Sequence, residues 1–155
     1  MEIKKQVNSI DAAQQTDQQA KEPVLPHLRK TLHEQMFDNE KSFLEVLRTL
    51  SPGTAIRTAL DDILRAQMGA LIVFEKEGIF EIIEGGFKIN SRFSAQRLVE
   101  LAKMDGAIVL SADLKKILYA NTLLAPSAKF TTKETGTRHK AAERTAKQLG
   151  TIVIA

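Results

Sequence analysis

Apolar positions follow two different spacings along the chain. They recur at three- and four-residue steps through residues 25–50, and again from about Thr54 to Gly69, which predicts amphipathic helices in both ranges. Residues 1–24 carry too few apolar side chains to offset about 1–2 kcal/mol per residue of backbone ordering. We therefore expect a disordered tail at 1–24, an N-terminal helical segment at 25–50 and one domain at 51–155.

Continuous apolar runs replace the helical spacing further along. Residues 70–74 and 107–110 are short unbroken runs, the pattern of strands that are covered on both faces. Residues 75–78 form a turn pattern that leads into 79–83, so the sequence predicts a hairpin there. Gly85-Gly86 predicts a second tight turn.

The remaining elements complete an alternation of helices and strands. Ser94 is placed to cap a helix, and a last helix is expected at about 136–149, ended by Gly150. The strand expected at 151–155 has the composition of a central strand, so we expect a domain truncated at its C-terminus; alternatively, this strand completes the sheet. The alternation predicts an α/β fold with a mixed central β-sheet flanked by helices.

Composition narrows the possible functions. The 155 residues carry a formal net charge of +3, only mildly basic. No apolar run approaches the ~20 residues of a membrane-spanning helix, and no hydrophobic signal segment follows the first Met, so we expect a cytoplasmic protein with no membrane partner. The absence of cysteine excludes disulfides, thiolate catalysis and cysteine-ligated metals. The usual glycine-rich phosphate-binding patterns are also missing.

Three potential cations stand at the start of the last expected helix. This basic triplet consists of Arg138, His139 and Lys140. It follows Gly136 and Thr137, where free backbone N–H groups and the helix dipole already attract anions. Cations oppose that dipole, but charge-assisted bonds to phosphate at ~1.5–3 kcal/mol each would reverse the balance. The alternative is a solvated basic turn paired with Glu134 and Glu143.

Asp105 and Gly106 stand where a helix ends and the strand at 107–110 begins. Taken alone, Asp-Gly is a turn dipeptide, and this plain interpretation is favoured. The alternative is that the Asp105 carboxylate holds a divalent cation against phosphate oxygens. Residues 121–124 end the next strand, where an exposed leucine could pack on a base, although core packing is its commoner fate.

Several stretches form one recognisable pattern in this order. They are Leu101 to Ser111, Lys116 to Asn121, and Glu134 to His139 followed by Ala142-Glu143-Arg144. From about Phe43 to Ala155 the chain resembles the diadenylate cyclase domain of the bacterial DNA integrity scanning protein family. That resemblance implies an enzyme, a nucleotidyltransferase that condenses two ATP into cyclic di-AMP and releases two pyrophosphates with Mg²⁺ or Mn²⁺.

The resemblance also implies roles for single residues. Asp105 would be the metal-binding catalytic carboxylate that helps to activate a 3′-hydroxyl, and Arg138 and His139 would be catalytic as well. Substrate contacts are implied for Gly106, Ala107, Leu124, Gly136, Thr137, Arg138, His139, Lys140 and Ala141, with Leu124 against the base. Each 3′-hydroxyl must meet the α-phosphate of the other ATP, so two protomers would face each other, within a homo-oligomer that the resemblance implies is an octamer.

The sequence departs from the family pattern in places, and two functions other than a cyclase remain as alternatives. Lys140 stands where the family usually has arginine, so a point charge replaces a bidentate fork. The family's C-terminal DNA-binding domain has no counterpart in these residues, so we expect DNA binding only through such a domain. The alternative to a cyclase is a non-catalytic adenine-nucleotide-binding fragment that lacks the C-terminal strands. A nucleic-acid-binding domain has only the net charge in its favour, with one Tyr and no Trp for stacking.

Overall fold

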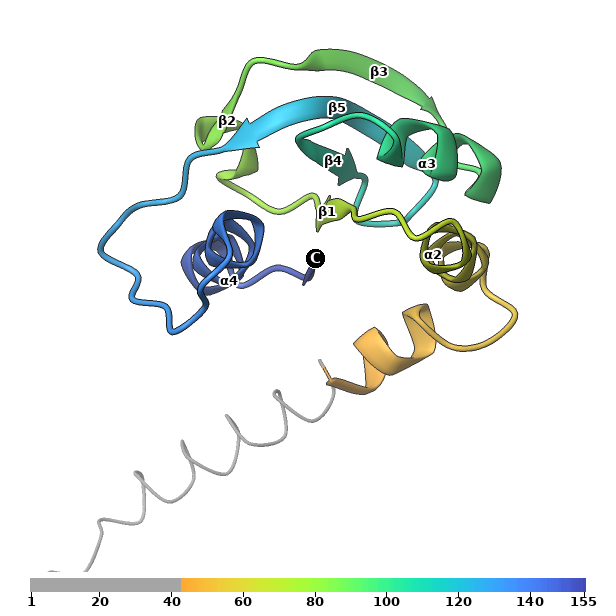
Figure 1. Cartoon of the computed structure of the whole chain (residues 1–155), viewed down its shortest axis with the longest axis horizontal. Helices are drawn as coiled ribbons and strands as arrows, with labels where there is room; N and C mark the ends of the chain where they lie inside the picture. The colour runs from red at the N-terminus through yellow and green to blue at the C-terminus, as the bar shows by residue number, and fades with distance from the viewer. Residues whose placement is uncertain (1–42) are drawn as a thin grey trace, which may run out of the picture. The chain divides into compact units, whose positions relative to one another are not determined.

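A six-stranded mixed sheet organises residues 43–155, the part of the chain that the computed structural model describes (Figure 1). The strand order is β2-β5-β4-β1-β6, and β3 also pairs with β5. β1 and β4 run parallel, whereas β6, β5, β3 and β2 pair antiparallel with their neighbours. The strands span Leu71–Phe74 (β1), Ile83–Glu84 (β2), Phe87–Arg92 (β3), Ala107–Leu110 (β4), Lys116–Leu124 (β5) and Val153–Ile154 (β6).

Helices cover both faces of this sheet. Ile72 and Phe74 of β1 pack into one core cluster together with residues of α2 (Ala55–Arg65) and α3 (Ala95–Ala102). Leu71 and Val73 belong to a second cluster, which also holds residues of α4 (Thr137–Leu149). Figure 1 shows α2 and α3 apart from α4. Neighbouring strand residues therefore face opposite cores, which confirms the α/β fold and the doubly covered strands.

Hydroxyl side chains cap the starts of α2 and α3. The Arg57 backbone N–H donates to Thr54 Oγ1 at 3.3 Å, which caps α2. The Arg97 N–H donates to Ser94 Oγ at 3.3 Å, which caps α3. α4 ends at Gly150, whose φ of 60° is left-handed. These ends confirm the predicted helix from about Thr54, the Ser94 cap and the helix at about 136–149.

Two predicted strands are wrong in detail. Residues 79–83 form no hairpin with 70–74; Ile79–Glu81 is a 3-10 helix (η1) and only Ile83–Glu84 is a strand, paired with β5. Both sides of β1 are occupied by β4 and β6, and burial of Ile79 and Ile82, three apart, suits a helical turn. Among the described strands, β6 lies at the end of the order and not at its centre.

The first part of the chain is described only from residue 43. The tail expected at 1–24, and most of the helical segment expected at 25–50, lie outside the described residues. Residues 43–49 are helical, with Phe43 and Leu44 exposed and Leu50 packed against the first core cluster. No helix among the residues that the structure describes has the length and apolar content to cross a membrane.

Candidate active site

One end of the sheet gathers the residues that the sequence singled out. In the parallel pair, Leu71 of β1 is the register partner of Ala107 of β4. In the antiparallel pair, Ala107 is the partner of Thr122, near the carboxyl end of β5. The amino ends of β1 and β4 and the carboxyl end of β5 therefore meet. We call this end of the sheet, residues 69–71, 105–107 and 122–124, the site rim.

Asp105 lies on the rim with a free carboxylate. It stands in the connection from α3 to β4, and its side chain is exposed. No ion pair or side-chain hydrogen bond within residues 43–155 uses the Asp105 carboxylate. An Asp that served only the turn would hydrogen-bond the neighbouring backbone, as Asp113 does with the Lys115 N–H at 3.0 Å. The predicted turn is present, and its carboxylate is left available to a ligand.

Gly106 brings the backbones of β4 and β5 together at the rim. Its φ is +87°, and a Cβ there would lie 2.9 Å from the Thr122 carbonyl oxygen. Directly beyond it, the Ala107 side chain is fully buried, and the Ala107 carbonyl accepts from Thr122 Oγ1 at 3.0 Å. Gly106 therefore fixes the close approach behind Asp105, while the methyl group of Ala107 belongs to the core.

The amino end of α4 is uncapped and cationic. Gly136 is the N-cap residue and offers no side-chain cap, and the three residues of the basic triplet are all exposed. Within the described residues, no hydrogen bond engages the backbone N–H groups of Thr137, Arg138 and His139. Free N–H groups at the positive end of a helix dipole, beside exposed cations, form an environment that binds anions.

The triplet is not neutralised by the acidic residues next to it. In the described part of the chain, no ion pair includes the triplet. Glu143 instead pairs with Lys147 and accepts from Thr132, and these partners hold the pKa of Glu143 below its usual value, Lys147 contributing most. The predicted pairing of the basic turn with Glu134 and Glu143 is therefore wrong, whereas the triplet is exposed, as a solvated turn requires.

Arg138 reaches the same end of the sheet as Asp105. A Cβ on Gly69 would overlap Nη1 of Arg138 and lie 3.0 Å from its Cζ, so the guanidinium rests on the Gly69 backbone. Gly69 precedes β1 by two residues, and Asp105 precedes the neighbouring strand β4 by two residues. Parallel neighbours run ~4.8 Å apart, so Asp105 and the Gly69 backbone that Arg138 contacts stand before the amino ends of adjacent strands.

The other predicted site residues on α4 differ in how their side chains are placed and buried. The His139 ring folds back over Gly136, with Nδ1 3.0 Å from where a Cβ would stand. Thr137 and Lys140 are exposed, whereas Ala141 is half-buried against the second core cluster. The contacts that the resemblance assigns to these residues stay predictions.

The exposed leucine at the end of β5 is not the expected one. Leu124 is 6% exposed and belongs to the second core cluster, whereas Leu123 is 62% exposed. Successive strand residues face opposite ways, and β2 pairs across Leu124, so Leu124 turns inward. Leu123, which the sequence reasoning did not select, is therefore the exposed leucine at the end of β5, and the contact that the resemblance assigns to Leu124 stays a prediction.

Polar residues of α4 also fix the loop that leads to the triplet, and the sequence reasoning missed them. Arg144 Nε donates to the Phe130 carbonyl at 3.0 Å, and Lys147 Nζ donates to the Thr131 carbonyl at 2.9 Å. The Ser127 N–H donates to Gln148 Oε1 at 2.7 Å. The sequence signal for these contacts was a set of polar side chains in adjacent turns of the helix that follows a polar loop.

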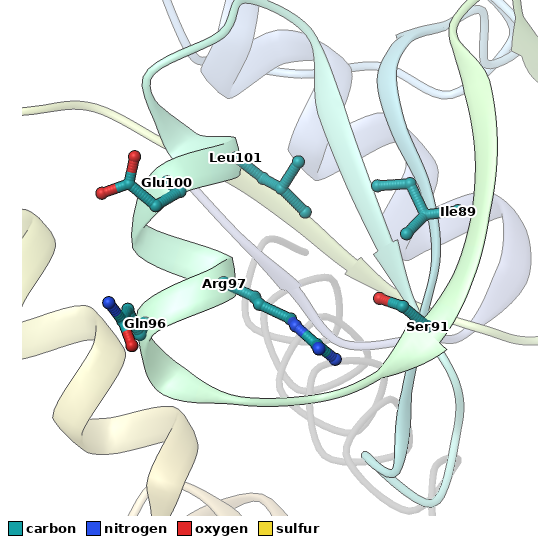
Figure 2. A pocket seen from close by; sticks show the side chains of 6 residues that line it. All are labelled: Ile89, Ser91, Gln96, Arg97, Glu100 and Leu101. Carbon is teal, nitrogen blue, oxygen red and sulfur yellow. The ribbon is translucent and has the colours of Figure 1, made fainter.

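A cavity of about 400 Å³ lies elsewhere in the fold. It lies between α3 and β3, where Arg97 and Leu101 point toward Ile89 and Ser91 (Figure 2). Its lining is Ile89, Ser91, Gln96, Arg97, Glu100 and Leu101. None of these residues belongs to the rim or to the basic triplet, and the candidate active site remains the open surface at the rim.

Comparisons with known proteins identify the family of the chain. The model of a family described as DisA bacterial checkpoint controller nucleotide-binding matches residues 57–155, which include Asp105 and the triplet. DNA integrity scanning protein DisA from Clostridium kluyveri is 56% identical over 119 residues, 76% of this chain and 34% of that protein. DisA from Acetivibrio thermocellus is 53% identical over 116 residues, 74% of this chain and 32% of that protein. The chain thus spans about a third of the length of these relatives.

Solved structures carry the same fold. A crystal structure of a double mutant of DacA from Staphylococcus aureus aligns with a TM-score of 0.51 and 30% identity, over 65% of this chain and 72% of that one. A crystal structure from Bacillus cereus, described as a hypothetical membrane spanning protein, aligns with a TM-score of 0.59 and 25% identity, over 95% and 74%. With the family match over residues 57–155, these likenesses establish that the chain belongs to the DisA-like diadenylate cyclase domain family.

Proposed function

We propose that the chain is a diadenylate cyclase that condenses two ATP into cyclic di-AMP and releases two pyrophosphates. One observation carries the proposal: an exposed, unpaired carboxylate and an exposed, unpaired guanidinium belong to the same end of the sheet, beside an uncapped helix start. A triphosphate needs cations and N–H donors for its oxygens, and its attacking hydroxyl needs a carboxylate nearby.

Each group has a distinct task in the proposed reaction. The 3′-hydroxyl oxygen of one ATP attacks the α-phosphorus of the other, the bond from that phosphorus to its bridging oxygen breaks, and pyrophosphate leaves. Asp105 helps to activate the hydroxyl, which loses its proton to solvent as the oxygen–phosphorus bond forms. Arg138, His139 and Lys140, with the free N–H groups of α4, stabilise the negative charge that grows on the α-phosphate and on the leaving pyrophosphate.

The residues at the rim fit a divalent cation shared with the substrate. No group of three or more His, Asp or Glu side chains that could hold a metal ion alone occurs within residues 43–155. Mg²⁺ is commonly held by one or two carboxylates together with substrate phosphates, and Asp105 is a free carboxylate of that kind. Mg²⁺ or Mn²⁺ bound there would neutralise charge on the phosphate oxygens.

The proposed chemistry requires two copies of the chain. One chain has one triplet and one Asp105, and so it serves one ATP, while ring closure needs each 3′-hydroxyl to reach the other α-phosphate. We propose a face-to-face pair of protomers within a homo-oligomer, an octamer, in the cytoplasm. The relatives are named for DNA integrity scanning, and we propose that DNA is bound by a domain in the part of their length that this chain does not span.

The test is product formation by the whole chain with ATP and Mn²⁺ or Mg²⁺, with cyclic di-AMP and pyrophosphate measured by mass spectrometry. Asp105→Asn and Arg138→Ala should each lower the rate by ~10²-fold or more. The first variant removes the carboxylate that helps to activate the attacking hydroxyl, and the second removes a cation that stabilises negative charge on the phosphates. Specific activity should fall on dilution, since the active form is a pair.

Matched variants separate the site from general charge effects. Asp113→Asn removes an exposed carboxylate from the β4–β5 turn, and Arg65→Ala removes a guanidinium whose side chain is 76% exposed. Neither residue belongs to the rim, so both variants should keep the full rate. Cyclic di-AMP formed at an undiminished rate by Asp105→Asn would refute the proposal, and so would ATP binding without turnover by the unaltered chain.

A further inference from the structure

The backbone conformation explains why glycine occurs at six of the eight glycine positions. Their φ values run from +60° to +91°, in the left-handed region that side-chain-bearing residues rarely adopt. They are Gly53, Gly78, Gly85, Gly86, Gly106 and Gly150. Gly69 and Gly136 are the remaining two, and neither has a φ in this region. Another reason must account for glycine at these two positions.

Space for the basic triplet accounts for both. At Gly69, a Cβ would overlap Nη1 of Arg138 and lie 3.0 Å from Cζ and 3.4 Å from Nη2. At Gly136, a Cβ would lie 3.0 Å from Nδ1 of His139. The two glycines that no turn requires are therefore the two against which triplet side chains rest. This coincidence ties Gly69, on a separate part of the chain, to the chemistry of α4.

The backbone at Gly69 is held from both sides. α2 ends in a Schellman motif: the Gln67 N–H donates to the Leu64 carbonyl at 3.0 Å, and the Met68 N–H donates to the Ile63 carbonyl at 3.1 Å. Met68 and Ala70 pack against the first core cluster, and β1 begins at the next residue. A Cβ at residue 69 therefore cannot be accommodated by the backbone, and the exposed guanidinium must move instead.

We propose that Gly69 is a positioning residue for Arg138. The missing side chain leaves the space in which the guanidinium lies beside the amino end of β1, next to the rim position of Asp105. The consequence for catalysis rests on the proposed function, because it takes Arg138 as a phosphate-binding group. Alanine at this position pushes the guanidinium off the rim without requiring a left-handed backbone or opening the core.

The test compares Gly69→Ala, Arg138→Ala and the double variant in the whole chain. Gly69→Ala should lower kcat for cyclic di-AMP formation at least tenfold, change KM for ATP by a smaller factor, and leave Tm no lower than in the unaltered chain. The double variant should be no slower than Arg138→Ala, since Gly69 acts only through Arg138. Unchanged kcat in Gly69→Ala, or a double variant slower than Arg138→Ala, would overturn the inference.

Gly53→Ala is the matched control. Gly53 has a φ of +91° and nothing within 4 Å of its missing Cβ, and it lies at the opposite end of α2 from Gly69. Alanine there should lower Tm through backbone strain and leave kcat unchanged, which is the reverse of the expected Gly69→Ala result. A loss of kcat in both variants, in proportion to lost stability, would mean that Gly69 is merely structural.

A second readout does not depend on turnover. The Nε–Hε resonance of Arg138, identified in a ¹⁵N-correlated NMR spectrum by its disappearance in Arg138→Lys, should shift in Gly69→Ala and stay in place in Gly53→Ala. If the unaltered chain makes no cyclic di-AMP, the proposed function fails while this shift still supports the positioning role. An unshifted resonance in Gly69→Ala overturns the positioning role whether or not the chain is active.

Discussion

Adjacent glycines in the β2–β3 turn allow backbone strain to be separated from crowding. Gly85 and Gly86 have φ values of +62° and +70°, so alanine pays the same conformational cost at either position. Their surroundings differ. A Cβ on Gly85 meets nothing within 4 Å, whereas a Cβ on Gly86 would lie 2.5 Å from the Ala120 carbonyl oxygen and 2.6 Å from Thr122 Cγ2. Gly86→Ala must therefore push β5 away at the rim.

The two costs can be estimated separately. A side chain in the left-handed region costs ~1–2 kcal/mol, which is the whole effect expected for Gly85→Ala. Overfilling a packed site costs a further ~1–3 kcal/mol, so Gly86→Ala should lose ~2–5 kcal/mol of unfolding free energy. At about 4 °C per kcal/mol for a unit of this size, the crowding alone should separate the two Tm values by about 4–12 °C.

Urea denaturation followed by circular dichroism measures both variants against the unaltered chain. The expected result is a lower midpoint for Gly86→Ala than for Gly85→Ala with the same m-value in both, because the exposed surface is the same. Equal midpoints would refute the close approach of Gly86 to β5. A lower midpoint for Gly85→Ala would refute the assumption that both glycines carry the same backbone cost.

Three further predictions concern separate parts of the fold. Ser111 Oγ and the Lys115 N–H donate to Asp113 and lower its pKa from 3.8 to about 2, with Ser111 contributing most. The ionised Asp113 carboxylate therefore stabilises the fold above its unfolded pKa, and this stabilisation is lost as the pH falls through the folded pKa. Tm measured against pH should show a deficit for Asp113→Asn at pH 7 that closes between about pH 4 and 2. Leu98→Ala empties a fully buried position of the first core cluster and should cost ~2–5 kcal/mol in urea unfolding. Leu123→Ala should raise KM for ATP in steady-state assays while Tm changes little, since this leucine is exposed at the rim.

The buried strands were predictable because their signal is local. Residues 70–74 and 107–110 contain no polar residue, and this composition survives only where both faces of a strand are covered, as in β1 and β4. The hairpin at 79–83 failed because the same apolar residues suit a strand or a helical turn. Its outcome depended on β4 and β6, which occupy both sides of β1 and come later in the chain.

The candidate site was predictable only in part. The exposed triplet followed from residues next to one another, since the charge and the helix start are both visible in the sequence. The placement of Asp105 and Gly69 at the same end of the sheet depends on the parallel pairing of β1 with β4, a contact between distant segments that no local spacing encodes. Gly69 was missed for the same reason, because only the folded chain shows that Arg138 fills its missing side chain.

The starts of the helices indicate that ligand binding explains the sequence at the amino end of α4 better than stability does. α2 and α3 begin with Thr54 and Ser94, whose hydroxyls satisfy a first-turn N–H. α4 begins with Gly136 and no side-chain cap, and cations follow where the dipole disfavours them. Stability alone would favour a capping hydroxyl at α4 as at α2 and α3, whereas none of the three helices has an acidic residue in its first turn. Among α2, α3 and α4, α4 is the helix without a side-chain cap, and its Arg138 lies against Gly69 at the rim. A bound polyphosphate would satisfy its free N–H groups and offset the cost of its cations.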